Sequence, residues 1–376
     1  MFFNNQKTAE KTGYIEMLKM IGSLSNLFSE SDVPYLYYRI AEKIFCNSFN
    51  AMDLSRSDVS ADAKKNTLGI GLKTFIFEGK NSYQKIAEFN KERPIYEKLN
   101  EVDLIKKISE LRNARIEFTK RVHRIDSFIY HCVLRDKGVF KIFEEKMENI
   151  NIEKINNVKK SKNSIKFEDG LNEYSFLISK STLTKKFSAS EFEHEFDVKI
   201  ISDPFEQLLK CFKKKEKEIG IYGKRIEQTI FLPLSDNKRK LVPPKSGLNQ
   251  WNAGGRKRHP DEVYIRIPAQ IHKFFPDFFP NRETPFALKL SDGKIVQAKI
   301  CQDGGKALMS YNNKDIGNWI LRDVLKLKEG TLVTYELLQI LGIDSVRIDK
   351  VGNLEYEINF AALGKYEEFE SNYLND

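Results

Sequence analysis

Cysteine, histidine and tryptophan are scarce in this sequence of 376 residues, which holds four, five and two of them respectively. The cysteines, Cys46, Cys132, Cys211 and Cys301, are far apart and form no Cys-x-x-Cys pair, which argues against a structural zinc site. No run of eighteen apolar residues occurs, so no transmembrane helix is expected. The first residues also lack the apolar stretch of a secretory signal. Together these absences favour a reduced, cytoplasmic protein.

The charge balance is basic, with 62 Lys and Arg against 53 Asp and Glu and a formal net charge of +9. Such a balance favours a polyanionic partner, although a merely basic enzyme fits it too. Apolar residues make up 41% of the chain, which is enough to build packed cores. At about 100–200 residues per domain, the length predicts two domains.

The composition and the predicted secondary structure of the chain change beyond its middle. Its first part mixes helix-like and strand-like segments, which predicts an α/β domain over residues 1–235. From Asn237 to Pro260 there are seven Lys and Arg but no Asp or Glu, and we place a basic linker at 236–245. Beyond it, short strands separated by turn signals such as Asp292-Gly293 and Gly352-Asn353 predict a mostly-β barrel or sandwich over 246–376. Within the first part we expect helices at 14–28, 35–49, 83–90, 101–136 and 204–218, strands at 58–63 and 68–77, and a hairpin across Asp169-Gly170.

One hairpin in the first part carries a candidate catalytic group. In DVSADAKKNTLGIGLKTF, Asp58 and Asp62 precede the second strand, and Lys73 is the odd member of the apolar run LGIGLKTFIF. Burying a lysine there is costly unless acids stand near it. The segment resembles the hairpin of the PD-(D/E)XK nucleases, in which a mixed sheet is flanked by helices. In that family an aspartate ends one strand, and an acid and a lysine lie two apart on the next.

The sequence departs from this family pattern at Gly71, which stands where the acid two residues before the lysine is expected. We expect Glu42, on the preceding helix, to replace it, and Glu78 is a weaker choice. The resemblance implies a magnesium ion held by Asp62 or Asp58 with Glu42, while Lys73 assists the attack of water on phosphorus. The alternative is an ordinary hairpin with a solvated lysine. A nuclease of the phospholipase-D type is disfavoured because none of the five histidines begins a His-x-Lys pair.

Two polar segments of the second part have the composition of base-reading loops. Arg and Lys can pair with guanine, Gln and Asn with adenine, and Asp can accept a hydrogen bond from cytosine. The segment QWNAGGRKRHPDE supplies Gln250, Asn252, Arg256, Lys257 and Arg258, and QDGGKALMSYNNKD, taken as one loop, supplies Gln302, Asp303, Lys306, Ser310, Asn312, Asn313 and Lys314. Two solvated polar loops are the plainer alternative.

The run from about 246 to 351 closely resembles the B3-like DNA-recognition domain of Type II restriction endonucleases, as in the NgoFVII-type, EcoRII and BfiI enzymes. The resemblance implies a seven-stranded pseudobarrel that grips the major groove with two loops. The whole chain is then expected to be a Type II restriction endonuclease that cuts double-stranded DNA with Mg²⁺, has no membrane contact, and works beside a cognate DNA methyltransferase. A homodimer is left open.

Two other functions stay open from the sequence. The first is a non-catalytic, sequence-specific DNA-binding protein whose N-terminal domain serves dimerisation or partner binding, and the missing acid at Gly71 keeps it open. The second is an RNA-processing nuclease, which is disfavoured because side chains cannot read the deep, narrow major groove of A-form RNA.

Overall fold

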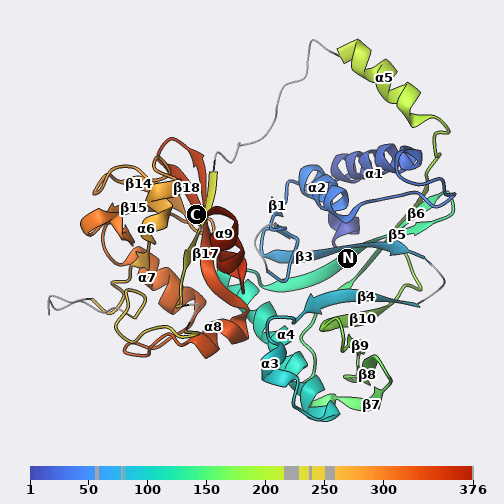
Figure 1. The fold of residues 1–376 in the computed structure, drawn as a ribbon. Helices are drawn as coiled ribbons and strands as arrows, with labels where there is room; N and C mark the ends of the chain where they lie inside the picture. The colour runs from blue at the N-terminus through green and yellow to red at the C-terminus, as the bar shows by residue number, and fades with distance from the viewer. Residues whose placement is uncertain are drawn as a thin grey trace. The chain divides into compact units, whose positions relative to one another are not determined.

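The computed structural model describes residues 1–55, 59–77, 79, 81–215, 228–236, 239–249 and 259–374. The chain divides into two compact units (Figure 1). Unit 1 comprises 1–113 and 125–222, and unit 2 comprises 114–124 and 223–376. None of the helices in the described ranges has the length and hydropathy needed to cross a membrane.

Unit 1 contains a six-stranded mixed sheet in the order β1-β2-β3-β5-β6-β11. Every neighbouring pair is antiparallel except β3 and β5, which run parallel and are joined through a crossover that includes the long helix α4. The strands are β1 (Met52–Asp53), β2 (Ala63–Lys65), β3 (Leu68–Ile76), β5 (Ser127–Asp136), β6 (Val139–Lys146) and β11 (His194–Asp197).

Helices α1 (Thr8–Ser23) and α2 (Tyr38–Phe49) pack on the sheet of unit 1 through an apolar cluster. Phe45 and Phe49 of α2 are fully buried there with Ile70 and Leu72 of β3. Side chains alternate along a strand, so Gly71 and Lys73 lie on the other face of β3. The helices predicted at 14–28 and 35–49 correspond to α1 and α2, with α1 beginning earlier.

A second sheet of unit 1 has five antiparallel strands in the order β4-β10-β9-β8-β7. They are β4 (Asn81–Glu88), β10 (Thr182–Ser188), β9 (Glu173–Leu177), β8 (Ser164–Glu168) and β7 (Asn156–Lys160). The hairpin predicted across Asp169-Gly170 is confirmed as β8–β9. The helix predicted at 83–90 is wrong, because most of that segment forms β4 and pairs with β10 from Asn81 to Glu88.

The remaining helices of the first part differ from the expected lengths. α4 (Glu101–His123) ends thirteen residues before the predicted 136, because the chain then enters the central strand β5. The last part of α4, from residue 114 on, belongs with Arg124 to unit 2. The short α3 (Arg93–Tyr96) precedes α4, and α5 (Pro204–Lys215) covers most of the predicted 204–218.

A buried polar chain in unit 1 holds the N-terminal residues against the sheet. His131 of β5 lies between Tyr14 and Glu144, with contacts of 2.9 Å to Tyr14 Oη and 2.7 Å to Glu144 Oε1. The backbone N–H of Phe3 donates to both oxygens of Glu144 at 3.1 Å. Each member is enclosed and partnered, as buried polar groups must be, so this histidine has a structural role.

Unit 2 contains a seven-stranded sheet in the order β12-β17-β18-β14-β15-β16-β13, with β14 and β18 parallel and the other neighbours antiparallel. The outermost strands β12 and β13 also lie near each other, so the sheet is nearly closed, consistent with the predicted pseudobarrel. The strands are β12 (Gln228–Pro233), β13 (Ile265–Arg266), β14 (Phe286–Lys289), β15 (Ile295–Cys301), β16 (Ala307–Ser310), β17 (Ile343–Gly352) and β18 (Glu355–Ala362).

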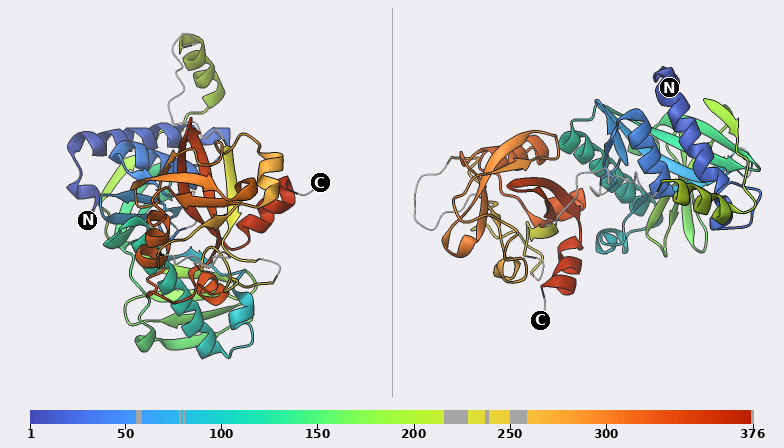
Figure 2. Two further views of the ribbon diagram at one scale, coloured as in Figure 1. Left: turned by 90° about the vertical axis from the view of Figure 1, so that its left-hand side faces the viewer. Right: turned by 90° about the horizontal axis from the view of Figure 1, so that it is seen from above.

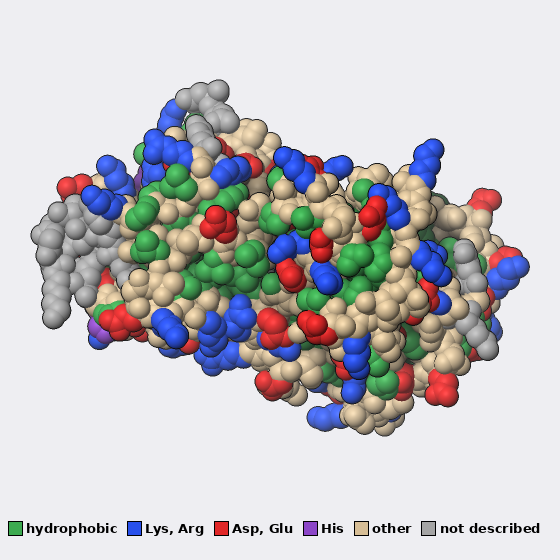
Figure 3. All heavy atoms as spheres, turned by 90° about the horizontal axis from the view of Figure 1, so that it is seen from below, with side chains coloured by type: hydrophobic (Ala, Val, Ile, Leu, Met, Phe, Trp, Pro, Cys, Tyr) green, Lys and Arg blue, Asp and Glu red, His purple; other side chains and the backbone are tan. Residues whose placement is uncertain are grey.

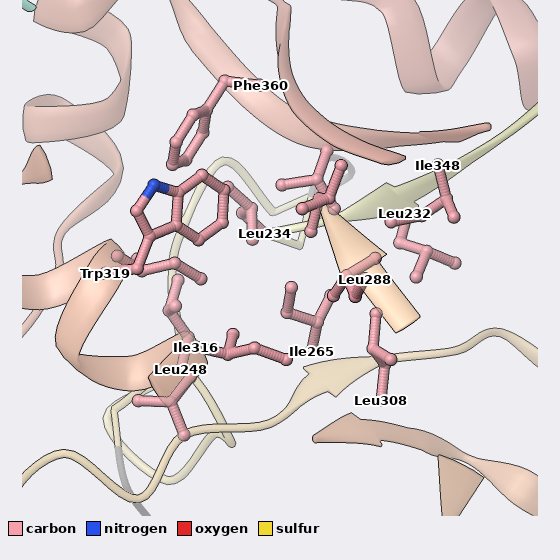
Figure 4. Close-up of a cluster of buried hydrophobic side chains, with 14 of the residues drawn as sticks. Leu232, Leu234, Leu248, Ile265, Leu288, Leu308, Ile316, Trp319, Ile348 and Phe360 are labelled. Carbon is pink, nitrogen blue, oxygen red and sulfur yellow. The ribbon is translucent and has the colours of Figure 1, made fainter. Parts of the chain in front are cut away.

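Helical segments cover this sheet and complete its core. Figure 4 shows Trp319 beside Phe360, with Leu232, Ile265 and Leu288 converging from different strands. The segments are α6 (Ala269–Phe274), α7 (Asp315–Gly317), a π-helical stretch η5 (Asn318–Val324), α8 (Tyr335–Leu341) and α9 (Lys365–Tyr373). Two further views (Figure 2) show the C-terminal helix α9 beside the sheet, and its Phe369 lies 5.5 Å from Phe231 of β12 between ring centres.

The start of unit 2 differs from the boundary predicted at 236–245. β12 precedes that segment yet pairs with β17 along its whole length, from Gln228 to Pro233. The segment itself is partly structured, since Asp236 bridges to Leu241 and Val242 is buried. The change in charge along the sequence places the boundary after β12. The sequence of β12 alone does not indicate that this strand pairs with the distant β17.

Candidate functional site

The hairpin of β2 and β3 fixes the position of Asp62. The Asp62 N–H donates to the Ile70 carbonyl at 2.9 Å, and its own carbonyl accepts from Leu54 N at 2.9 Å. Its side-chain Oδ2 accepts from the backbone N–H of Leu72 at 2.7 Å. The carboxylate is therefore held beside the strand residue that precedes Lys73.

Lys73 is half-buried on β3 and forms no hydrogen bond or ion pair with any residue in the described ranges. Burial raises the pKa of Asp62, and the positive charge of Lys73 is the strongest influence acting in the opposite direction. The structure thus brings Asp62 and Lys73 within electrostatic reach of each other. An amine without a fixed partner is available to a ligand.

Glu42, on helix α2, lies within electrostatic reach of Asp62. Only 4% of Glu42 is exposed, and its Oε2 accepts from Arg39 Nη1 at 3.1 Å. Burial raises the pKa of Glu42, and the negative charge of Asp62 is the next cause in size. A buried carboxyl group whose ionisation a second acid opposes is typical of a site that binds a cation.

Asp53 is an acid of this site that the sequence analysis did not identify. It lies on β1 opposite Ala63, next to Asp62, and its charge contributes to the raised pKa values of both Glu42 and Asp62. The nearby Cys46 thiol responds to the same surroundings, since burial and the charges of these acids raise its pKa to about 12. β1 has only two residues, so the sequence pattern could not place Asp53 in the sheet.

The structure explains why position 71 carries no acid. A Cβ atom on Gly71 would lie 2.5 Å from Met147 Cε and 3.1 Å from the Tyr130 ring. The space that the family acid would fill is therefore occupied by two other side chains. Any replacement acid must come from a different element, and Glu42 and Asp53 are the described candidates.

The residues fit a hard divalent cation in part. Magnesium prefers carboxylate oxygens, which Glu42 and Asp62 offer, and Arg39 already pairs with Glu42. Among the described residues, no three Asp, Glu, His or Cys side chains are grouped closely enough to hold a metal ion. Asp58 and Glu78, which were also predicted as ligands or alternatives, lie outside the described residues.

Unit 1 also has a separate pocket of about 470 Å³, which is less suited to a metal ion. Its charged walls are paired with each other: Lys186 with Glu173 at 2.5 Å, and Lys185 with Glu145. These pairs leave little unbalanced charge for a metal ion, so we place the candidate catalytic site at the hairpin.

The first predicted DNA-reading loop lies outside the described residues, including Gln250, Asn252, Arg256, Lys257 and Arg258. The residues that follow this loop are described, and hydrogen bonds from Arg322 hold them in place. Arg322 Nε donates to Asp261 Oδ1 at 2.7 Å, and Arg322 Nη2 donates to the Pro260 carbonyl at 3.1 Å. The loop therefore rejoins the fold beside α7 and η5.

The second predicted loop is two turns, because the buried strand β16 occupies its middle. Gln302, Asp303 and Lys306 lie in the turn before β16, where Gln302, Gly304 and Gly305 all have positive φ. These three polar side chains are exposed, and Asp303 pairs with Arg282 at 2.9 Å. This glycine-rich turn can approach a ligand closely.

The other turn follows β16 and carries Asn312, Asn313 and Lys314. Asn312 Oδ1 accepts from the backbone N–H groups of Lys314 and Asp315, at 3.1 and 3.3 Å, so its side chain shapes the turn. Ser310 is fully buried on β16, and its Oγ accepts from Ile316 N at 3.3 Å. We therefore leave Ser310 out of the surface proposed below.

Surface charge alone does not mark a nucleic-acid interface. On the face in Figure 3, basic and acidic side chains are interspersed in both units instead of gathering by sign. Of the predicted linker residues, Lys240 pairs with Glu367 at 2.9 Å and Arg239 lies 3.7 Å from Asp236, while Lys238 lies outside the described residues.

Comparison with known proteins agrees with the fold of unit 2. No curated protein matches the chain at a significant level. Residues 221–351 match a family described as the NgoFVII C-terminal B3-like DNA-binding domain. The match begins before β12 and ends at β17, so it includes the strand that lies before the predicted linker. It supports a C-terminal DNA-binding domain of the restriction-enzyme type in this chain, with double-stranded DNA as its partner.

Proposed function

We propose that the protein is a Type II restriction endonuclease in which unit 2 selects a DNA sequence and unit 1 cuts both strands with Mg²⁺. The observation that carries the proposal is that Asp62, at one PD-(D/E)XK-like hairpin, lies within electrostatic reach of both Glu42 and Lys73. These residues are separated in sequence, and two of them are carboxyl groups whose pKa values are raised.

Each residue has a distinct role in this proposal. Glu42 and Asp62, with Asp58, would hold the magnesium ion, which would supply Lewis-acid stabilisation of the phosphate. The Leu72 N–H orients the Asp62 carboxylate through the 2.7 Å hydrogen bond. Lys73 would neutralise charge that develops on the phosphate, because its ammonium is not engaged by another described residue.

Sequence selection would depend on the first loop and the two turns of unit 2. Arg256, Lys257 and Arg258 with Gln250 and Asn252 would read base edges from the first loop, and Gln302, Asp303 and Lys306 from the glycine-rich turn. Asn313 and Lys314 would contribute from the other turn. A cognate methyltransferase would protect the same sequence in the host, and a homodimer would let two catalytic sites cut two strands.

A second function stays open on two specific observations. A Cβ atom at position 71 would meet Met147 and the Tyr130 ring, and the described residues show no three-ligand metal group. Both facts suit a DNA-binding protein whose first unit has lost catalysis or serves partner binding.

Plasmid cleavage separates the two functions. Purified protein is incubated with DNA of known sequence in Mg²⁺, in Ca²⁺ and in EDTA, and binding is measured in parallel. Discrete fragments in Mg²⁺ alone support the nuclease. Specific binding without cutting in every metal supports the second function.

A further inference from the structure

Two exposed tyrosines lie side by side where helix α2 begins. Tyr37 is 42% exposed and Tyr38 is 47% exposed, and their ring centres are 4.5 Å apart with an interplanar angle of 56°. Tyr14, Tyr96, Tyr130 and Tyr174 of the same unit are buried. Rings that pack on each other while facing solvent are typical of a surface that meets a partner.

Arg39 connects this aromatic pair to the candidate catalytic site. Its guanidinium carbon lies 5.3 Å from the centre of the Tyr38 ring. The same guanidinium donates to Glu42 Oε2 at 3.1 Å and to the Ser55 carbonyl at 2.9 Å. Tyr38 and Glu42 are four residues apart on one helix, so they lie one turn apart on the same side.

We propose that Tyr37, Tyr38 and Arg39 form a stacking platform for a DNA base that has left the double helix next to the cleaved phosphate. The proposal rests on the nuclease function proposed above, because it takes the phosphate to lie between Lys73 and Glu42. Aromatic rings and guanidinium planes stack on any base, whereas their few polar atoms give little base discrimination. The platform would therefore add affinity and positioning without changing the recognised sequence.

The chemistry of the patch favours DNA over a protein partner. The patch places a cationic, planar group between two exposed rings and a carboxyl site that awaits a cation. A nucleotide satisfies all three parts, because its base stacks on the rings, its phosphate meets the cationic groups, and its phosphate oxygens can share a metal ion with Glu42. An apolar protein segment would satisfy only the rings.

The test uses full-length protein and two measurements. The first is cleavage of duplex DNA by the double variant Tyr37→Ala/Tyr38→Ala, by Tyr37→Phe/Tyr38→Phe, and by Tyr373→Ala. Tyr373 is a matched control, since it is an exposed tyrosine on α9 of unit 2. Stacking of one base contributes a factor of about 5 to 150, so we expect the double alanine variant to cut about 10-fold more slowly or worse. Tyr373→Ala should cut within twofold of the wild type, because it leaves the platform intact. The phenylalanine variant should cut faster than the double alanine variant, because it keeps both rings.

The second measurement detects the unstacked base directly. 2-Aminopurine, which fluoresces more strongly when unstacked, is placed at each position across the bound sequence. The signal is recorded with Lys73→Ala protein in Ca²⁺, so that no cutting interferes. We expect one position to change its fluorescence, and we expect that change to disappear when Tyr37→Ala/Tyr38→Ala is added.

The outcomes distinguish a failure of the platform proposal from a failure of the nuclease function. If the wild type does not cut but the fluorescence change requires both tyrosines, the platform stands and the nuclease function fails. If the wild type cuts while the double alanine variant cuts equally fast, the platform is wrong. A fluorescence profile that is identical with and without the two tyrosines overturns it in either case.

Discussion

Glu42 and Asp62 lie in surroundings that oppose their ionisation, which is costly for a structural residue and useful in a metal site. Burial is the first cause of the raised pKa of each carboxyl group, and neighbouring acids add to it. Functional sites commonly keep such unfavourable arrangements at the expense of stability.

This reasoning predicts that Glu42→Gln stabilises the protein at neutral pH while it reduces cutting. A raised pKa means that the folded state prefers the protonated carboxyl, so ionisation above the ordinary value of 4.5 destabilises the fold. The gain in melting temperature should therefore grow as pH rises from 4 to 7. Thermal unfolding across that pH range measures it.

Glu173→Gln is the matched control, with the opposite sign. The hydrogen bond from Lys186 lowers the pKa of Glu173, so its loss should reduce the melting temperature at neutral pH. If Glu42→Gln is destabilising at pH 7 to the same degree, Glu42 has a structural role and the site assignment is wrong.

Gly71→Glu should not restore a family-like site, because the added side chain meets Met147 and Tyr130. Overpacking of this kind costs about 1–3 kcal/mol, and a buried carboxyl adds to it. Gly13→Glu is a suitable control, since nothing lies within 4 Å of a Cβ there. Chemical denaturation compares the two variants. Equal stability of Gly71→Glu and wild type would show that the space is not filled in solution.

The two turns that flank β16 should contribute differently to DNA binding. Gln302→Ala removes an exposed amide, so if that amide reads a base, it should cost about 1–3 kcal/mol at the preferred sequence only. Lys314→Ala should weaken binding to all duplexes and reduce the log–log salt slope by about 0.9, as expected for one lost phosphate contact. Salt titrations on specific and scrambled duplexes distinguish these patterns. If the two variants behave identically, the assignment of base reading to Gln302 and phosphate contact to Lys314 is wrong.

At the scale of elements, sequence patterns predicted the hairpins whose two strands are close in sequence. They did not predict strands that pair with a distant part of the chain. The hairpins β8–β9, β14–β15 and β17–β18 follow from turn residues and alternation that lie within a few positions. Segment 83–90 was predicted as a helix, yet β4 forms there because β10, about a hundred residues later, pairs with it. For the same reason, the sequence did not predict Asp53 as a site residue or β12 as a strand of unit 2. Asp62 and Lys73 lie in one hairpin, so they could be predicted together.

Strand β12 should decide where a foldable fragment begins. A fragment of residues 246–376 lacks Ile230, Leu232 and Leu234, whose burial contributes about 1.5–3 kcal/mol each. That sum is comparable with the whole stability of a typical domain, about 5–15 kcal/mol. We therefore expect 221–376 to melt cooperatively and 246–376 to melt at a much lower temperature or not at all. Equal melting temperatures would show that β12 is dispensable.

At the scale of the whole molecule, the proposed function assigns DNA recognition to unit 2 and cleavage to unit 1. The family match and the nearly closed sheet support DNA binding by unit 2. The proposed cutting function depends on Glu42 of α2, Asp62 beside β2 and Lys73 of β3. The most direct test of the account therefore measures binding and cutting together and removes only one of them.

That measurement is the digestion of a long DNA of known sequence by wild type and by Lys73→Ala, with Lys159→Ala of β7 as a control lysine. Wild type and Lys159→Ala should give the same discrete fragments in Mg²⁺, whose ends map to one short sequence, and no cutting in EDTA. Lys73→Ala should bind that sequence as tightly as wild type and cut at least 100-fold more slowly. If Lys73→Ala cuts at the wild-type rate, or if wild type binds one sequence and cuts it with no divalent metal, the assigned site is contradicted.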